Sequence, residues 1–227
     1  MIKEAKFAIL NKIQSNLKII NLQLPELKSN QVLVKILYTG ICGSQIMEID
    51  GNRGVDKYLP HALGHEASGI IIDKHKDIKK FKLKDKVIIT WIKTNNTDSE
   101  KIYYLNGKNK VNAGYANTFS NYAIVSKNRC IKKPKQLSMM SAALYGCAIP
   151  TGVGMVLNEK LKKNSNIVLT GFGGIGFFVY LALKSKGIKN IIIIEKNNHK
   201  LKIAKRMKLK NFYKDIDIKA IHTLFKT

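Results

Sequence analysis

The chain has 227 residues, of which 45% are hydrophobic, and this is enough to form one large or two ordinary packed domains. The formal charge of +25 suggests a polyanionic partner, but only Arg53, Arg129 and Arg206 among the 40 basic residues are arginines, and the lysines are spread from Lys3 to Lys226. Because bidentate contacts to phosphates and bases favour arginine, this composition disfavours specific binding of nucleic acid.

Residues 1–155 are predicted to form a mainly β domain. The N-terminus begins a charged, strand-like segment without an apolar stretch long enough for a signal peptide. Residues 31–38 and 86–92 carry the β-branched, partly alternating pattern of strands. Residues 95–114 are rich in Asn, Asp, Ser and Gly and predict a long surface loop, after which helical periodicity begins near residue 138.

Residues 156–227 change to a different pattern. It predicts a short buried strand at 167–170, a turn at 171–176, a helix at 177–186, a second strand at 191–195 and a second helix at 198–208. Strands and helices that alternate with short connections are typical of a parallel α/β domain. The uncharged stretch from 167 to 183 is slightly short for a membrane-spanning helix and begins with glycines, so we expect no membrane span.

A glycine-rich turn joins the first of these strands to the first helix. Gly171, Gly173 and Gly176 satisfy G-x-G-x-x-G, and Gly174 lies in the same turn. In such a turn the first glycine permits the sharp bend, the second lets the backbone approach a pyrophosphate, and the third lets the helix pack closely on the strand. The helix N-terminus then offers N–H groups to the phosphates. This arrangement predicts a dinucleotide site, although a glycine-rich turn that binds nothing has the same pattern.

The acidic residue expected after such a turn is Glu195, at the end of the second strand. A carboxylate there can accept hydrogen bonds from a ribose diol and would repel a 2′-phosphate, so we expect NAD rather than NADP. Lys196, next to it, weakens that preference.

Four other residues are of the types that bind zinc: Cys42, His65, Glu66 and Cys147. Their separation in the sequence does not prove that they are close in space, and a lone buried cysteine is usually only a small apolar side chain. With Cys130 the cysteines make an odd number without a paired spacing. This favours a reducing compartment over a disulfide framework, so we expect the cytoplasm.

Four motifs give the chain a resemblance to a known family. They are Gly40-Ile-Cys-Gly-Ser, Gly64-His-Glu, Gly146-Cys-Ala-Ile-Pro-Thr-Gly and Gly171-Phe-Gly-Gly-Ile-Gly. Their order and spacing resemble those of the zinc-dependent medium-chain alcohol dehydrogenases, and the segment Cys-Gly-Ser at residues 42–44 resembles the polyol branch. The resemblance implies an N-terminal GroES-like, mainly β catalytic domain followed by a Rossmann-type nucleotide-binding domain, with one catalytic zinc in the cleft between them.

The resemblance also implies a role for each matching residue of the metal site. Cys42, His65 and Cys147 match the three zinc ligands, and Glu66 matches an acidic neighbour that can approach the metal as a fourth, exchangeable ligand. Ser44 matches the hydroxyl that passes on the alcohol proton. The implied reaction transfers a hydride between an alcohol, possibly a sugar-like polyol, and NAD, with an aldehyde or ketone as the other product.

On the cofactor side, Thr151 matches a residue beside the nicotinamide and Lys200 matches one beside the adenosine ribose. Trp91 falls where such enzymes often place a bulky side chain of the substrate pocket, although a tryptophan of the core fits equally well. A homo-oligomer is an open option, because the sequence does not fix the oligomeric state.

The sequence departs from the family pattern at several positions. Gln45 stands where relatives commonly have an aspartate that steadies the zinc-bound histidine, and Met47 replaces a frequent histidine of the proton relay. His75 and Lys84 occupy turns that usually have glycine, so those turns must be rebuilt or strained. Residues 95–114 contain no cysteine, which removes the family's second, structural zinc.

The sequence ends at Thr227, after about one mononucleotide-binding half of the Rossmann domain. The expectation from the resemblance is therefore a truncated member whose C-terminal half of that domain is missing. Two alternatives to a zinc dehydrogenase follow: a zinc-free reductase of the same superfamily, or an inactive protein or binding module that keeps the fold.

Overall fold

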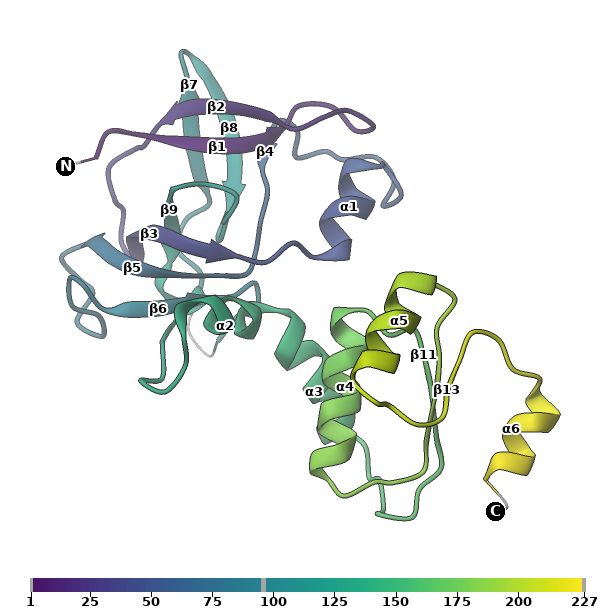
Figure 1. Ribbon diagram of the computed structural model, residues 1–227. Helices are drawn as coiled ribbons and strands as arrows, with labels where there is room; N and C mark the ends of the chain where they lie inside the picture. The colour runs from purple at the N-terminus through teal and green to yellow at the C-terminus, as the bar shows by residue number, and fades with distance from the viewer. Residues whose placement is uncertain (1, 95–96, 226–227) are drawn as a thin grey trace. The chain divides into compact units, whose positions relative to one another are not determined.

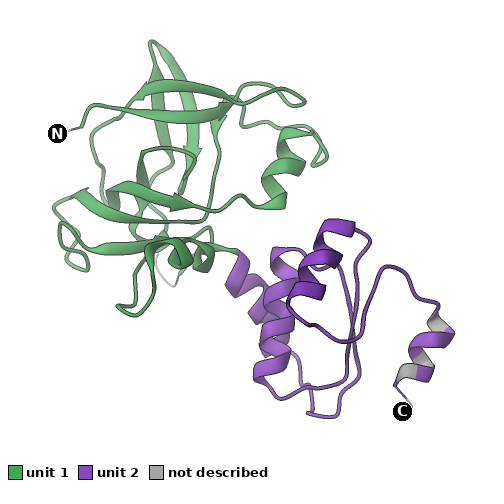
Figure 2. Cartoon of the chain, viewed as in Figure 1, with its two compact units in different colours: residues 1–147 green, residues 148–227 purple. Residues whose placement is uncertain are grey.

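The computed structural model describes residues 2–94 and 97–225, and Figure 1 shows its helices and strands. The chain divides into two compact units, Met1–Cys147 and Ala148–Thr227 (Figure 2). The boundary predicted at residue 155 falls inside helix α3 (Ala148–Leu157), the first element of the second unit.

A closed barrel makes up one part of the first unit. Its strands, in order around the barrel, are β1 (Glu4–Leu10), β2 (Lys18–Gln23), β7 (Ile102–Asn106), β8 (Asn109–Gly114) and β4 (His61–Ala62). Alternate residues of β1 are buried, as period-two side-chain alternation requires of a strand with one face on a core. Phe7 of β1 packs on Tyr104 of β7 with ring centroids 4.3 Å apart, so aromatic packing joins these strands inside the barrel.

An antiparallel sheet makes up the other part of the first unit. Its strand order is β10 (Cys130–Lys132), β6 (Lys86–Ile89), β5 (Ala67–Lys74), β3 (Gln31–Thr39) and β9 (Tyr122–Ser126). Short helices follow two of these strands: α1 (Gly43–Ile49) after β3, and α2 (Met139–Ala143) after β10. The 3₁₀ turns are η1 (Lys127–Arg129) and η2 (Leu144–Gly146).

The prediction of a long loop at residues 95–114 was wrong for most of that segment, while residues 95 and 96 lie outside the described residues. Strands β7 and β8 form a hairpin there, with a turn at Gly107, whose φ is +59°. The polar composition concealed an alternation in which Ile102, Tyr104, Val111 and Ala113 are buried in the barrel. Those buried side chains stabilise the hairpin through one face, as expected of strands that cover a core.

The two turns that lack the family's glycines behave differently. Lys84 has φ of +69°, so it adopts the left-handed conformation that normally favours glycine. His75 is not among the described residues with positive φ; its Nδ1 lies 2.8 Å from Asp77, so this turn is rebuilt around a polar contact. One turn is therefore strained and the other has a different local structure.

The second unit has the predicted parallel α/β pattern. After α3 come β11 (Ile167–Thr170), α4 (Gly174–Ser185), β12 (Ile191–Ile194), α5 (Asn198–Arg206), β13 (Phe212–Tyr213) and α6 (Ile218–Leu224). The sheet order is β11-β12-β13, and both pairs of strands are parallel. Helix α4 begins three residues before the predicted residue 177, because the last two glycines of the turn already belong to the helix. Buried apolar residues of β12 and α4 form the centre of this unit.

No single helix within the described part of the chain is long and apolar enough to cross a membrane. The consecutive helical segments Met139–Gly146 and Ala148–Leu157 reach that length and composition only when they are counted together across the break between them.

Candidate metal centre and nucleotide turn

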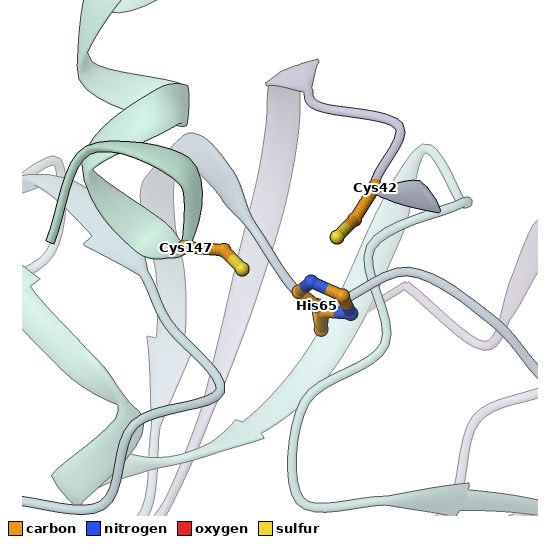
Figure 3. Close-up of side chains that lie close together, drawn as sticks. All are labelled: Cys42, His65 and Cys147. Atoms are coloured by element: carbon orange, nitrogen blue, oxygen red, sulfur yellow. The ribbon is translucent and has the colours of Figure 1, made fainter. Parts of the chain in front are cut away.

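Three of the predicted metal ligands come together in the first unit. The ligand atoms of Cys42, His65 and Cys147 all lie within 4.8 Å of one another. Cys42 caps the N-terminus of α1, His65 lies between β4 and β5, and Cys147 follows η2. Figure 3 shows the thiols of both cysteines pointing toward the imidazole ring. Residues from segments as far as 105 positions apart in the sequence therefore form one compact donor set.

Hydrogen bonds to backbone carbonyl groups hold the segments that carry these ligands. The Gly40 N–H donates to the carbonyl oxygen of Glu66 at 3.0 Å, and the Thr39 hydroxyl donates to the same oxygen at 2.9 Å. The Thr90 hydroxyl, at the end of β6, donates to the buried carbonyl of Gly146 at 2.6 Å. The segments that carry the three ligands are thus held by hydrogen bonds to neighbouring segments.

Glycines before the ligands leave room for close packing. A Cβ on Gly40 would lie 2.4 Å from Oε1 of Glu66, and a Cβ on Gly146 would lie 2.2 Å from the carbonyl oxygen of Ile89. Gly64, directly before His65, has φ of +94°. Gly146 is therefore required by close backbone approach and Gly64 by its backbone conformation, whereas an added Cβ at Gly40 would collide only with the Glu66 side chain.

The environment of His65 suits a metal ligand. Its Nε2 atom is buried and has no hydrogen-bond partner. Burial, and secondly the positive charge of Arg53, lower the pKa of His65, which favours the neutral imidazole that metals bind. Two thiols and one imidazole are the donor set of zinc sites that keep a fourth position open for a water molecule or substrate, so these residues fit a zinc ion.

The other predicted residues of this site lie nearby in the chain but in different surroundings. Glu66 is 2% exposed and packs against Gly40 and Gly146, outside the group of three ligands. Ser44 is half-buried on α1, two residues after Cys42. Gln45 is buried on the same helix, and its Oε1 atom has no hydrogen-bond partner.

Trp91 is 51% exposed, and its carbonyl oxygen accepts a hydrogen bond from Arg129. The expectation that Trp91 belongs to the core therefore does not hold. The pocket-lining role of Trp91 stays a prediction.

The glycine turn of the second unit has the predicted conformation. Gly171 has φ of +84°, and a Cβ on Gly176 would lie 2.1 Å from the carbonyl oxygen of Gly171. Gly173 caps α4 without a side-chain hydrogen bond, and Gly174 is the first residue of the helix. Because Gly173 provides no side-chain cap, the first N–H groups of this 12-residue helix can donate to an anion.

Glu195 lies beside this turn. Its Oε2 accepts a hydrogen bond from the Phe172 N–H at 2.7 Å and lies 3.3 Å from Nζ of Lys200, while Oε1 accepts from the Asn197 N–H at 2.8 Å. Burial alone would raise the pKa of Glu195, but these hydrogen bonds and the lysine charge lower it overall. The side chain is therefore an ionised carboxylate next to the glycine turn.

Thr151 lies on α3, half-buried, and takes part in local interactions. The hydroxyls of Thr39 and Thr90, which hold the ligand segments, could not be predicted from the sequence, because isolated threonines have no motif. Nor did the sequence indicate a second group within 4.8 Å that could hold a metal, formed by Glu48, Asp56 and His61.

Residues 28–135 match the family described as "Alcohol dehydrogenase GroES-like domain". The fold is accordingly a GroES-like β domain, with a barrel and a five-stranded sheet, followed by a parallel α/β segment that resembles the start of a Rossmann domain. The predicted fold class is confirmed.

Curated relatives match over most of the chain. An alcohol dehydrogenase class-3 of Caenorhabditis elegans is 28% identical over 88% of the chain, and an alcohol dehydrogenase of Geobacillus stearothermophilus is 27% identical over 96% of it. The chain spans 59% and 66% of the lengths of these two proteins. Among solved structures, the benzyl alcohol dehydrogenase of Acinetobacter calcoaceticus has the same fold, with a TM-score of 0.84, 23% identity, and coverage of 99% of this chain and 68% of that one.

Proposed function

We propose that this chain is a member of the medium-chain zinc alcohol dehydrogenase superfamily and a zinc-dependent oxidoreductase that transfers a hydride between an alcohol or polyol and NAD, a proposal supported by the match of residues 28–135 to the GroES-like domain family. The observation that carries the proposal is the group of Cys42, His65 and Cys147. In this proposal the predicted catalytic domain, residues 1–155, holds the metal and the substrate, and residues 156–227 hold the nucleotide.

The three ligands have separate tasks. The two cysteines would bind as thiolates and His65 as a neutral imidazole, in line with its lowered pKa. A zinc ion held there supplies a Lewis acid that lowers the pKa of a bound alcohol. Glu66, buried directly after His65, would provide the carboxylate for ligand exchange.

Ser44 would take up the proton of the alcohol O–H group, because its hydroxyl can accept one proton and pass another on. A nicotinamide cofactor, when bound, would supply the acceptor for the hydride of the carbinol carbon, so that the alcohol would give up one proton and one hydride to become the carbonyl compound. Met47, on the same helix, cannot continue a proton relay by hydrogen bonding, so the proton would pass from Ser44 to water or to the cofactor ribose.

The nucleotide would bind at the glycine turn. The N–H groups at the start of α4 would donate to the pyrophosphate, and Glu195 would accept from the adenosine ribose diol. Its hydrogen bonds from Phe172 and Asn197 hold the carboxylate at the end of β12. We therefore propose NAD as the preferred cofactor, with Lys200 near the ribose and Thr151 near the nicotinamide.

A second proposal is an inactive member or binding module that keeps the fold. The buried, unpartnered Gln45 favours it, because a carboxylate that would steady the metal-bound histidine is absent there. Loss of such a partner typically costs about 10–100-fold in metal affinity or activity. The zinc-free reductase is disfavoured by the three ligands that lie together.

The experiment uses the untagged chain, loaded with zinc and incubated with NAD and a panel of alcohols and polyols. We expect NADH formation that requires zinc and is lost in Cys42→Ala, while Cys130→Ala keeps it. Zinc and NADH binding without turnover of any substrate would favour the binding module. Turnover that persists in metal-free protein would favour the zinc-free reductase.

A further inference from the structure

The first unit contains a second set of donors that could hold a metal, separate from Cys42, His65 and Cys147. It consists of Glu48 on α1, Asp56 in the segment that follows and His61 on β4, and the three ligand atoms lie within 4.8 Å of one another. All three side chains are largely shielded from solvent, with exposed fractions of 23%, 8% and 11%.

The three donors face one another. Nε2 of His61 lies 2.8 Å from Oδ2 of Asp56, which is an ion-pair contact when the imidazole is protonated, but neither of these buried atoms has a partner with hydrogen-bond geometry. Nε2 also lies 3.8 Å from Oε1 of Glu48. Buried polar atoms normally have a partner of good geometry, and a cation between a neutral imidazole and these carboxylates would supply one.

A cavity of about 320 Å³ adjoins the set, and Glu48 and His61 line it. Gln45, one turn before Glu48 on α1, lines the same cavity and is 4% exposed, and its Oε1 atom has no partner. His65 also lines this cavity, so it adjoins both donor sets, and the unpartnered Oε1 of Gln45 could bind either a cation or a water molecule attached to one.

We propose that Glu48, Asp56 and His61 form a second metal site, which binds a divalent transition-metal ion of the zinc type. Two carboxylates balance the charge of such an ion, and an imidazole favours zinc over magnesium or calcium. This site has no thiol ligand, whereas the first site has two.

The distances fit after a small adjustment. Metal–ligand bonds of about 2.0–2.2 Å put tetrahedral ligand atoms about 3.4 Å apart. The two measured separations from Nε2, 2.8 Å and 3.8 Å, lie on either side of this value, so shifts of about half an ångström would complete the site. Arg53 lies 4.0 Å from Oε2 of Glu48 and its side chain is 57% exposed, so it can move away without leaving a buried charge.

The position of the site points to a structural task. His61 pairs with β1 and β8 of the barrel, and Glu48 is on the helix that Cys42 caps. A cation there would tie α1 to the barrel strand that leads to His65. The expectation of no structural zinc rested on the lack of cysteines in residues 95–114, and this site uses none.

The test measures zinc bound to the untagged, full chain by equilibrium dialysis. We expect two zinc ions per chain in the wild type, one in His61→Ala, and one in the double variant Cys42→Ala/Cys147→Ala. The matched control is His199→Ala, an exposed histidine of α5 in the second unit, which should keep both ions.

A milder variant guards against loss of folding. Asp56→Asn should weaken the second zinc about 10-fold or more while circular dichroism stays unchanged. One zinc in the wild type, or a second zinc that His61→Ala and Asp56→Asn leave in place, would overturn the proposal. Cobalt separates the two sites, because only the cysteine site gives thiolate-to-cobalt charge-transfer absorption, and the double variant should retain one cobalt without it.

Discussion

Replacement of Gly146 by alanine should destabilise the first unit and weaken the metal site together. The added methyl group would lie 2.2 Å from the carbonyl oxygen of Ile89 and 2.7 Å from Cβ of Glu66. Favourable carbon contacts lie at about 3.5–4.0 Å, so the overlap exceeds an ångström and involves backbone that cannot rotate away. Overpacking of a close-packed interior costs about 1–3 kcal/mol, and we expect the upper end of that range in the free energy of unfolding.

Cys147 directly follows Gly146, so the same displacement should lower zinc affinity about 10-fold or more, as loss of support around metal ligands typically does. Gly43→Ala is the matched control, because a Cβ there meets nothing within 4 Å and the residue opens helix α1. Its free energy of unfolding should stay the same or rise by up to about 1 kcal/mol.

The assay is urea unfolding followed by the fluorescence of Trp91, the single tryptophan, which reports on the first unit alone. Zinc affinity is measured on the same samples by competition with a chelating dye. If the free energy of unfolding of Gly146→Ala lies within about 0.5 kcal/mol of the wild-type value and the variant keeps its zinc, the close approach of these backbones is not required. This threshold is about the spread seen for neutral surface substitutions.

Three further predictions concern other parts of the chain. Lys84→Gly should raise the free energy of unfolding by about 0.5–1 kcal/mol in the same urea assay, because glycine adopts a φ of +69° without strain. Glu195→Gln should destabilise the second unit by about 1 kcal/mol at neutral pH, measured by circular dichroism. The pKa of Glu195 is lowered in the folded state, so its ionised form stabilises the fold above the ordinary glutamate pKa of about 4.3. This stabilisation is lost as the pH falls through the folded pKa. The difference in free energy of unfolding between the wild type and Glu195→Gln should therefore shrink in acid. Burial raises the pKa of Cys130 to about 12, so at pH 8 a thiol reagent should modify Cys42 in metal-free protein and leave Cys130 unmodified, as peptide mass spectrometry would reveal.

The sequence predicted those features that a local pattern specifies. The glycine turn predicted the strand and helix around it, because only glycine permits the φ of Gly171 and the contact at Gly176. The helical periodicity expected from near residue 138 corresponds to α2, whose N-cap Ser138 accepts a hydrogen bond from the Ser141 N–H. Cytoplasmic location remains a prediction of the sequence, which leaves the oligomeric state open.

The features that depend on the barrel were not visible in the sequence. The β7–β8 hairpin has the composition of a loop, and only the interior of the barrel selects its alternating buried residues. The three zinc ligands could be connected only through a family resemblance, because no spacing rule relates Cys147 to Cys42. Glu48, Asp56 and His61 belong to three separate segments, so their approach depends on how α1 lies against the barrel.

The most direct test of the central claim, that Cys42, His65 and Cys147 hold a metal ion, is the absorption spectrum of the cobalt-loaded chain. We predict intense thiolate-to-cobalt charge-transfer bands that weaken or vanish in Cys42→Ala and in Cys147→Ala and persist in Cys130→Ala. A cobalt-loaded chain without these bands, or bands that only Cys130→Ala removes, would contradict the claim.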